Sequence, residues 1–586
     1  MIHFKKFFQQ NKLLFFLTAI ILSIQMIGIL AIPFLIGKLI DKGIIPRNQD
    51  VVLSLGIQML IIAILGCLIS ILGNILSAKL AANYGFETRQ DFYQKTQELS
   101  LKKMDSFSIS SLLTRMMNDV TNVQRSLMMI FHLVLPAPII SIFAVFMTFI
   151  KSPILSLIPL ISIVVYLISV YYLMKKGLPL SNKIQQQLDA MISKLREFFN
   201  GINMIRAFDN QDIEESKTNE RFQNYADSMI AVNKIFSLLT PIAYIIMGIV
   251  FPLIIWLGSL LVGQGLLQIG TITSVIEYST LTLSYLISAA MVLVTLPRSM
   301  ASLRRIDTVL EVPFETLDIK NSTFNEKTFL VAEDTLATFN NVTFSYDGGE
   351  PVLENINFSI PKGKTTAIVG GTGSGKSTIA KLLLNLYQID SGEIILKNRS
   401  LYTWEQDSIF EIISYTPQKA FLFSGTIESN LLLGNPKATK KDIKNAIEIS
   451  QASSFIVNQK KGYQTKVSQG GSNFSGGQKQ RISIARTLIK PADLYIFDDS
   501  FSALDYQTDA NLRQALKVKM SQQTFLIIAQ RLNTIREADQ IIVLDEGKIV
   551  GKGTHKLLLS TNKIYQEFAL SQGIPLKGEN ENDSSK

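Results

Sequence analysis

Long apolar runs alternate with charged stretches through the first half of the chain. Six of these runs are long enough to cross a lipid bilayer as helices, which takes about 20 residues. Lipid offers no hydrogen-bond partners, so a spanning segment must satisfy its backbone groups internally, as a helix does. The pattern predicts membrane spans at residues 13–36, 53–76, 127–150, 154–174, 242–262 and 272–296.

Two of the segments between these spans, residues 79–125 and 175–234, are long and rich in lysine and arginine. Both show helical spacing and few glycines, which predicts membrane helices that continue out of the bilayer and fold back as long arms. Because basic residues stay on the cytoplasmic side, both arms and both chain termini are expected in the cytoplasm. The composition, rich in lysine, isoleucine and asparagine, is typical of a low-GC bacterium. We therefore expect a multi-pass protein of the bacterial plasma membrane, in contact with membrane lipid.

The net charge of +10 follows the same arrangement. Basic residues flank the apolar spans, so membrane topology explains the charge and no nucleic-acid partner is expected. The single cysteine, Cys67, lies in an apolar run, which excludes an internal disulfide and a cysteine metal cluster. Glu277 is an acidic residue inside a predicted span. It either binds or gates a cation in a cavity, or it lies at the level of the outer headgroups.

Changes in polarity along the chain predict the domain boundaries. Residues 1–12 carry Lys5 and Lys6 among apolar side chains, which favours a helix lying in the membrane interface over a disordered basic terminus. The predicted order is then a membrane domain at 13–303, a polar linker at 304–336, a soluble α/β domain at 337–572 and a polar tail at 573–586.

The soluble part contains a phosphate-binding loop, GGTGSGKS at residues 370–377, between an apolar strand and a helix. Glycines let the backbone wrap around phosphates, and Lys376 reaches the β- and γ-phosphates of ATP. The hydroxyl of Ser377 is placed to bind Mg²⁺. The nucleotide-binding residues predicted here are Gly370, Gly371, Thr372, Gly373, Ser374, Gly375, Lys376, Ser377 and Thr378.

Two further motifs complete a pattern. An apolar strand ends at Asp498, the carboxylate expected beside Mg²⁺, and residues 473–478 read NFSGGQ. With these motifs the chain resembles, from about residue 13 to 572, an ABC transporter half of the exporter type. The resemblance implies a six-span α-helical membrane domain with long cytoplasmic arms. A P-loop ABC ATPase domain of α/β class, with a helical signature subdomain, follows it.

The resemblance also assigns roles to residues outside the loop. Tyr346 matches the residue that stacks on adenine, and Gln418 matches the glutamine that approaches Mg²⁺ and the attacking water. In this family one ATP lies between two ATPase domains. The partner domain's ATP is therefore covered by the signature residues Ser475, Gly476, Gly477 and Gln478. ATP and Mg²⁺ are the implied cofactors, and a second ABC half-transporter is the implied partner.

Two residues depart from the family pattern at the position where ATP is cut. Asp499 stands where most exporters have the glutamate that activates water, and Gln530 replaces the usual histidine. Aspartate is one methylene shorter, and glutamine cannot become cationic. The chain resembles the degenerate-site subunit of heterodimeric multidrug exporters, which implies tight binding and slow hydrolysis of ATP. A homodimer with a tolerated variant site is the alternative.

We therefore expect ATP-driven export of amphipathic or lipophilic compounds by one half of a heterodimer, with a hydrophobic small molecule as substrate. Its ATPase activity should be weak without the partner subunit. Two other readings stay open. One is a dedicated lipid or peptide exporter. The other is a regulator or channel that uses ATP for gating without transport.

Overall fold

The structure is a computed structural model that describes residues 2–313, 334–346 and 348–575. The chain divides into two compact units, a helical one within residues 1–314 and an α/β one in the remainder. The predicted linker and the predicted tail lie largely outside the described residues. Helix α11 runs on to Leu310, into the segment predicted as linker, and strand β1 begins at Thr335.

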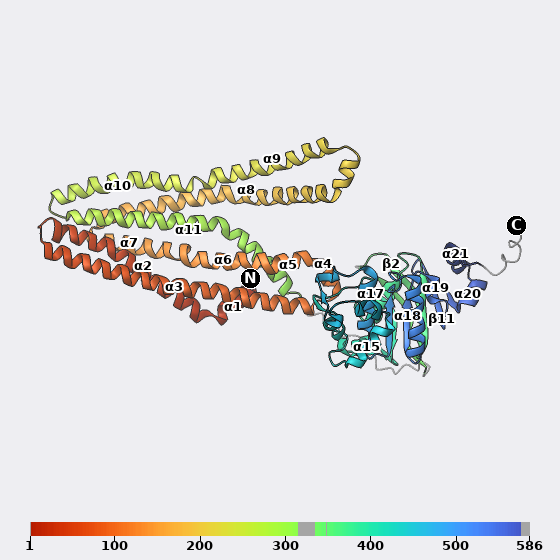
Figure 1. The fold of residues 1–586 in the computed structure, drawn as a ribbon. Coiled ribbons are helices and arrows are strands. Elements are labelled where there is room, and N and C mark those ends of the chain that lie inside the picture. The colour runs from red at the N-terminus through yellow and green to blue at the C-terminus, as the bar shows by residue number, and fades with distance from the viewer. Residues whose placement is uncertain (1, 314–333, 347, 576–586) are drawn as a thin grey trace. The chain divides into compact units, whose positions relative to one another are not determined.

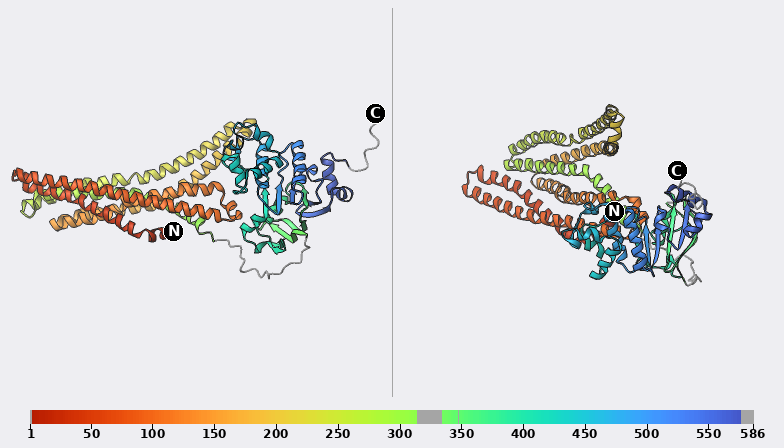
Figure 2. Two further views of the ribbon diagram at one scale, coloured as in Figure 1. Left: turned by 60° about the horizontal axis from the view of Figure 1, so that its bottom comes forward. Right: turned by 45° about the vertical axis from the view of Figure 1, so that its right-hand side comes forward.

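Long helices build the first unit (Figure 1). Within the described residues, six of its helical segments are long and apolar enough to cross a membrane, which confirms the predicted six-span fold. The spans contain α2 (Lys12–Leu39), α3 (Gln49–Glu98), α7 (Pro136–Lys151), α8 (Pro153–Ala207), α10 (Leu239–Gly263) and α11 (Ile269–Leu310). Figure 2 shows these helices from two further directions.

The arms are continuations of the spans. Helix α3 carries on past its apolar part to Glu98, and α8 carries on to Ala207, where the chain turns into α9 (Gln211–Phe236). The third span is broken into pieces, with two π-helical turns at Arg115–Asp119 and Ile130–Val134. The second precedes Pro136, whose missing N–H removes a regular helix hydrogen bond. The remaining short helices are α1 (Ile2–Gln10), α4 (Leu101–Phe107), α5 (Ile109–Thr114) and α6 (Val120–Met129), with a further π-helical turn at Ile40–Ile44.

Helix α1 lies against α3. Phe7 is 2% exposed and contacts Tyr84 of α3 edge to face, with ring centroids 5.2 Å apart. Lys5, Lys6 and Phe8 stay exposed on the other side of the helix. The terminus is therefore helical and amphipathic, and the partly exposed Phe8 also contacts Phe15 of α2, with ring centroids 4.8 Å apart.

Helices α2 and α11 approach each other closely through glycines. A Cβ atom on Gly270 would lie 2.0 Å from the carbonyl oxygen of Gly37, so neither position has room for a side chain. Ser274 donates to the carbonyl of Pro33 at 2.8 Å, and Asp41 accepts the backbone N–H of Gly270 at 2.6 Å. Small residues permit this backbone approach, and hydrogen bonds then hold the two helices together.

The second unit is built on a six-stranded sheet of order β12-β11-β3-β10-β9-β6, parallel except for β12. Its strands are β3 (Thr365–Gly370), β6 (Ile413–Thr416), β9 (Leu494–Asp498), β10 (Thr524–Ile528), β11 (Gln540–Asp545) and β12 (Lys548–Gly553). An antiparallel sheet contains β1 (Thr335–Ser345), β2 (Pro351–Pro361), β4 (Ser391–Leu396) and β5 (Arg399–Ser400), and a small pair is formed by β7 (Gly425–Thr426) and β8 (Lys466–Val467).

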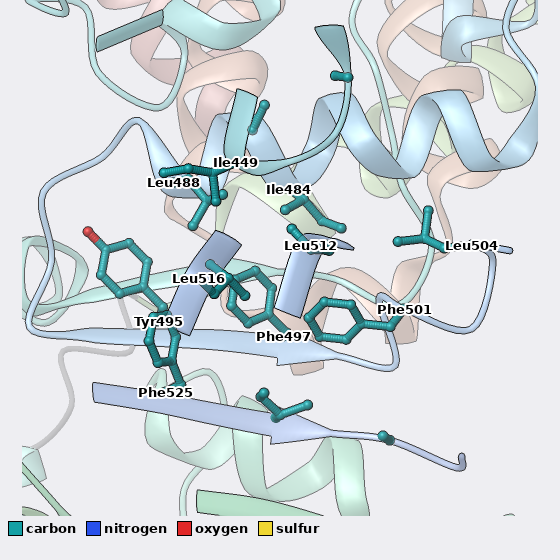
Figure 3. Packing of buried hydrophobic residues seen from close by; sticks show 14 of the residues in the cluster. Ile449, Ile484, Leu488, Tyr495, Phe497, Phe501, Leu504, Leu512, Leu516 and Phe525 are labelled. Atoms are coloured by element: carbon teal, nitrogen blue, oxygen red, sulfur yellow. The ribbon is translucent and has the colours of Figure 1, made fainter. Parts of the chain in front are cut away.

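The helices of this unit connect or follow its strands. They are α12 (Lys376–Leu383), α13 (Gln406–Ile412), α14 (Ile427–Leu432), α15 (Lys440–Ile449), α16 (Ser453–Val457), α17 (Gly476–Leu488), α18 (Tyr506–Lys519), α19 (Leu532–Ile535), α20 (His555–Thr561) and α21 (Lys563–Ser571). Helices α14 to α17, between β6 and β9, form the predicted helical subdomain. Leu512 and Leu516 of α18 lie against Phe497 of β9 (Figure 3). Ile484 and Leu488 of α17 belong to the same buried cluster. This packing holds α17 and α18 against the parallel sheet.

Candidate functional site

The phosphate loop joins the carboxyl end of β3 to the first turn of α12. Gly373 and Gly375 have φ of 83° and 93°, in the left-handed region that favours glycine. A Cβ atom on Gly370 would lie 2.1 Å from the carbonyl oxygen of Leu544, so this glycine also permits close packing on β11. Nothing lies within 4 Å of the corresponding position on Gly371. The backbone therefore presents an open, glycine-lined loop at the start of a helix.

Lys376 lies inside this loop. Its ammonium group donates to the carbonyl oxygens of Gly370 at 3.0 Å and Gly371 at 2.5 Å. The side chain is buried, and burial lowers the pKa of Lys376 while the nearby Asp499 and Asp498 charges oppose that shift. A phosphate is a stronger acceptor for an ammonium group than a neutral carbonyl. The loop and its lysine therefore fit a polyphosphate.

Asp498 accepts two hydroxyl hydrogen bonds at the end of β9. Ser377 donates to Oδ1 at 2.7 Å and Tyr415 donates to Oδ2 at 3.1 Å. Burial raises the pKa of Asp498, and these two hydrogen bonds pull the pKa in the opposite direction. A carboxylate beside a hydroxyl supplies the oxygen ligands that Mg²⁺ takes in nucleotide sites. The pair of Ser377 and Asp498 predicted for Mg²⁺ is thus in contact.

The three residues predicted to be catalytic meet at one oxygen atom, Oδ2 of Asp499. Oδ2 of Asp499 accepts from the amide of Gln530 at 3.2 Å and from the amide of Gln418 at 3.4 Å. The backbone of Asp499 has φ of 46°, in the left-handed region, and its N–H donates to the carbonyl of Ile528 at 2.8 Å. Burial raises the pKa of this carboxyl group as well.

Tyr346 lies beside the first turn of α12. Its hydroxyl is 3.1 Å from that of Thr378, and its ring meets Tyr387 edge to face at 5.2 Å between centroids. The ammonium group of Lys381 lies 5.7 Å from the centroid of the Tyr346 ring. The predicted adenine contact is therefore half-buried among other aromatic side chains at the rim of the phosphate loop.

The signature residues cap helix α17 and face outward. Oγ of Ser475 accepts the backbone N–H of Gln478 at 3.3 Å, and Oε1 of Gln478 accepts that of Ser475 at 3.0 Å. Nothing lies within 4 Å of a Cβ atom built on Gly476. Within the described residues, the side chains of this motif make no hydrogen bond to the phosphate loop. The motif therefore presents an exposed helix N-terminus, which favours anions.

Known proteins share both halves of this architecture. The family model described as ABC transporter transmembrane region matches residues 14–286, and the one described as ABC transporter matches residues 353–502. The chain is 32% identical to an uncharacterised ABC transporter ATP-binding protein, YfiB of Bacillus subtilis, over 92% of this chain and 93% of that one. The chain belongs to the ABC transporter family.

Two other similar proteins extend the comparison of this ABC transporter. It is 29% identical to a putative export ATP-binding/permease protein of Rickettsia felis, over 94% of this chain and 96% of that one. A solved structure of a bacterial Atm1-family ABC exporter with ATP bound shares 23% identity, with a TM-score of 0.78 over 96% of this chain and 98% of that chain. This likeness shows the fold. The transporter is a multi-pass membrane protein with one membrane region fused to one ABC ATPase domain, which binds ATP.

Two side chains at this site were not predicted from the sequence. Tyr415 reaches Asp498 from β6, and Tyr387 joins Tyr346 from the turn after α12. Tyr415 lies in ISYT, where an isolated tyrosine in a short strand carries no signal of its own. Only the pairing of β6 with β9 places it beside the carboxylate.

Proposed function

We propose that this ABC transporter exports amphipathic or lipophilic compounds across the bacterial plasma membrane as one half of a heterodimer. ATP bound at its own phosphate loop is hydrolysed slowly, and its signature motif completes the partner's active site. The observation that carries the asymmetry is the cluster of Asp499, Gln530 and Gln418. Both departures from the family pattern meet at one oxygen atom, so they alter a single chemical step.

That step needs a base that reaches water and a donor that stabilises charge. The carboxylate of Asp499 is held by two neutral amides, neither of which becomes cationic as charge develops. The left-handed backbone of Asp499 suits aspartate and disfavours longer side chains. A general base acts through a hydrogen bond of about 2.6–3.2 Å, so a shorter side chain loses contact with the water.

The residues proposed to bind nucleotide keep the family pattern, whereas those proposed to hydrolyse ATP depart from it. Lys376, Ser377 and Asp498 lie together as Mg²⁺ and phosphates require. Ser475 and Gln478 form a full capping box. Gly476, which lies between them in the sequence, has open space where a Cβ atom would be. These features support nucleotide binding in this chain and a competent signature for the partner's ATP.

The cargo proposal draws on a polar stripe along α11. Its members are spaced by three, four or seven residues, which places them on one face of the helix. The side chain of each is exposed or half-buried in this chain. They are Glu277, Thr280, Ser284, Ser288, Thr295 and Arg298. The hydroxyls of Thr280, Ser288 and Thr295 donate to backbone carbonyls of the same helix. The carboxylate of Glu277 is costly against lipid, so this face lines a wet cavity or a partner. Such a lining suits compounds that are partly polar and partly apolar. Both termini lie in the cytoplasm, as the distribution of basic residues requires.

Two substitutions in this chain test the asymmetry in the complex with a second ABC half-transporter. Lys376→Ala weakens this chain's own site, and Ser475→Arg blocks the partner's site. We expect the complex to keep most of its steady-state ATPase activity with Lys376→Ala and to lose it with Ser475→Arg. Equal loss from both substitutions, or robust activity of the purified chain alone, would show two equivalent sites and overturn the proposal.

A further inference from the structure

Two lysines share one aromatic ring at an end of the membrane unit. Lys38 lies one turn after Phe34 on α2, and its ammonium group is 4.5 Å from the Phe34 ring centroid. Lys151, the last residue of α7, places its ammonium group 5.0 Å from the same centroid. Both contacts are within the range of a cation–π interaction. Both ammonium groups therefore lie within about 5 Å of one uncharged ring, one from each helix.

Carboxylates do not balance these charges. In the described parts of the chain, no ion pair involves Lys38 or Lys151. Asp41, one turn further on from Lys38, accepts the backbone N–H of Gly270 at 2.6 Å. Two like charges near one ring repel each other, and an anion that contacts both relieves this repulsion.

A cavity of about 140 Å³ lies next to the same ring, between α2 and α7. Its lining consists of apolar side chains, namely Ile27, Leu30, Ala31, Phe34, Phe143 and Met147. An apolar cavity of about 150 Å³ holds one benzene molecule, so this one takes a hydrocarbon segment of about six carbons. Phe34 thus connects a hydrocarbon pocket to a pair of cations.

We propose that α2 and α7 form a binding site for an anionic phospholipid. Its phosphate lies between Lys38 and Lys151, and part of one acyl chain fills the cavity beside Phe34. Lys38 follows the first span and Lys151 follows the third, so both lie at the leaflet opposite the chain termini. A free phosphate ion satisfies the lysines but leaves the apolar cavity unfilled. The two halves of the site together match one amphiphile.

The test measures lipid selectivity of the full chain in detergent–lipid mixtures. Spin-labelled phosphatidylglycerol and phosphatidylcholine of equal chain length are compared by the fraction immobilised on the protein. We expect Lys38→Gln to weaken phosphatidylglycerol binding about fivefold, and Lys38→Gln with Lys151→Gln about thirtyfold. Phosphatidylcholine binding should not change. The control is Lys42→Gln with Arg47→Gln, which removes the same charge on the same side from exposed positions. It should keep the selectivity.

A second variant examines the cavity without touching the charges. Ala31→Leu fills part of it, so long-chain lipids with either headgroup should bind more weakly, while both lysines remain. Unchanged phosphatidylglycerol selectivity in the double lysine variant, or an equal loss in the control, would contradict the proposal. Displacement of the lipid by millimolar inorganic phosphate would assign the site to a free anion instead. Because no ATP turnover is measured, a negative result leaves the export proposal standing.

Discussion

Restoring the family residues at the altered site should convert it into a faster ATPase. The change is Asp499→Glu combined with Gln530→His. Oδ2 of Asp499 now accepts two amides, at 3.2 Å from Gln530 and 3.4 Å from Gln418. Glutamate extends the carboxylate by about 1.5 Å, one carbon–carbon bond, toward the phosphates. Histidine adds a group that becomes cationic as charge develops.

The double substitution changes both the rate of hydrolysis and the stability of the domain. A positioned general base contributes about 10²–10⁴-fold, and one donor to developing charge contributes about 10²–10³-fold. Against this, Asp499 has φ of 46°, and a glutamate in this region costs about 1 kcal/mol more than an aspartate. That cost lowers the thermal midpoint of the domain by about 2–4 °C. We therefore expect turnover to rise at least about 100-fold with a small loss of stability.

The assay is steady-state phosphate release at saturating Mg–ATP by the complex with a second ABC half-transporter whose own phosphate-loop lysine is replaced by alanine, so that only this chain's site turns over. Asp499→Asn is the matched control, because asparagine keeps the size and tolerates the left-handed backbone but removes the charge. Lys376→Ala sets the background. Nucleotide affinity is measured in parallel, so that a change in turnover is separated from a change in binding. An unchanged rate in the double variant with intact ATP affinity would refute the reasoning from Asp499 and Gln530.

Three further predictions concern single contacts. The raised pKa of Asp498 means that its ionised form destabilises the fold, and this cost grows as the pH rises through that pKa. Asp498→Asn should therefore raise the thermal midpoint of unfolding near neutral pH when no nucleotide is present. In calorimetry with ATP, adding Mg²⁺ should not shift the thermal midpoint of this variant any further. Ser475→Ala removes the N-cap of α17 and should cost about 1 kcal/mol in denaturant unfolding of the chain, whereas Ser475→Thr should restore it. Gly270→Ala forces a Cβ atom to within 2.0 Å of the Gly37 carbonyl oxygen and should cost about 1–3 kcal/mol. Gly28→Ala, which meets nothing within 4 Å, is its control in a thermal size-exclusion assay.

Local patterns in the chain determined the elements of both units. Each membrane span is a continuous apolar run, so its helix follows from the absence of hydrogen-bond partners in lipid. The phosphate loop is contiguous from Gly370 to Ser377, and its glycines are needed at the positions where φ is positive. The roles of Gln418, Asp499 and Gln530 came through family resemblance, because their separation along the chain carries no geometric information.

Tertiary structure decided which of these elements meet. Strands β9, β10 and β6 are separated by long helical segments, and their order in the sheet brings Asp499, Gln530, Gln418 and Tyr415 to one edge. The contacts of Lys38 and Lys151 with Phe34 likewise depend on how α2 packs on α7. A local pattern specifies hydrogen bonding and polarity within one segment. Strand order and helix packing arise from competition among many segments for the same buried surface, and no single segment records the outcome.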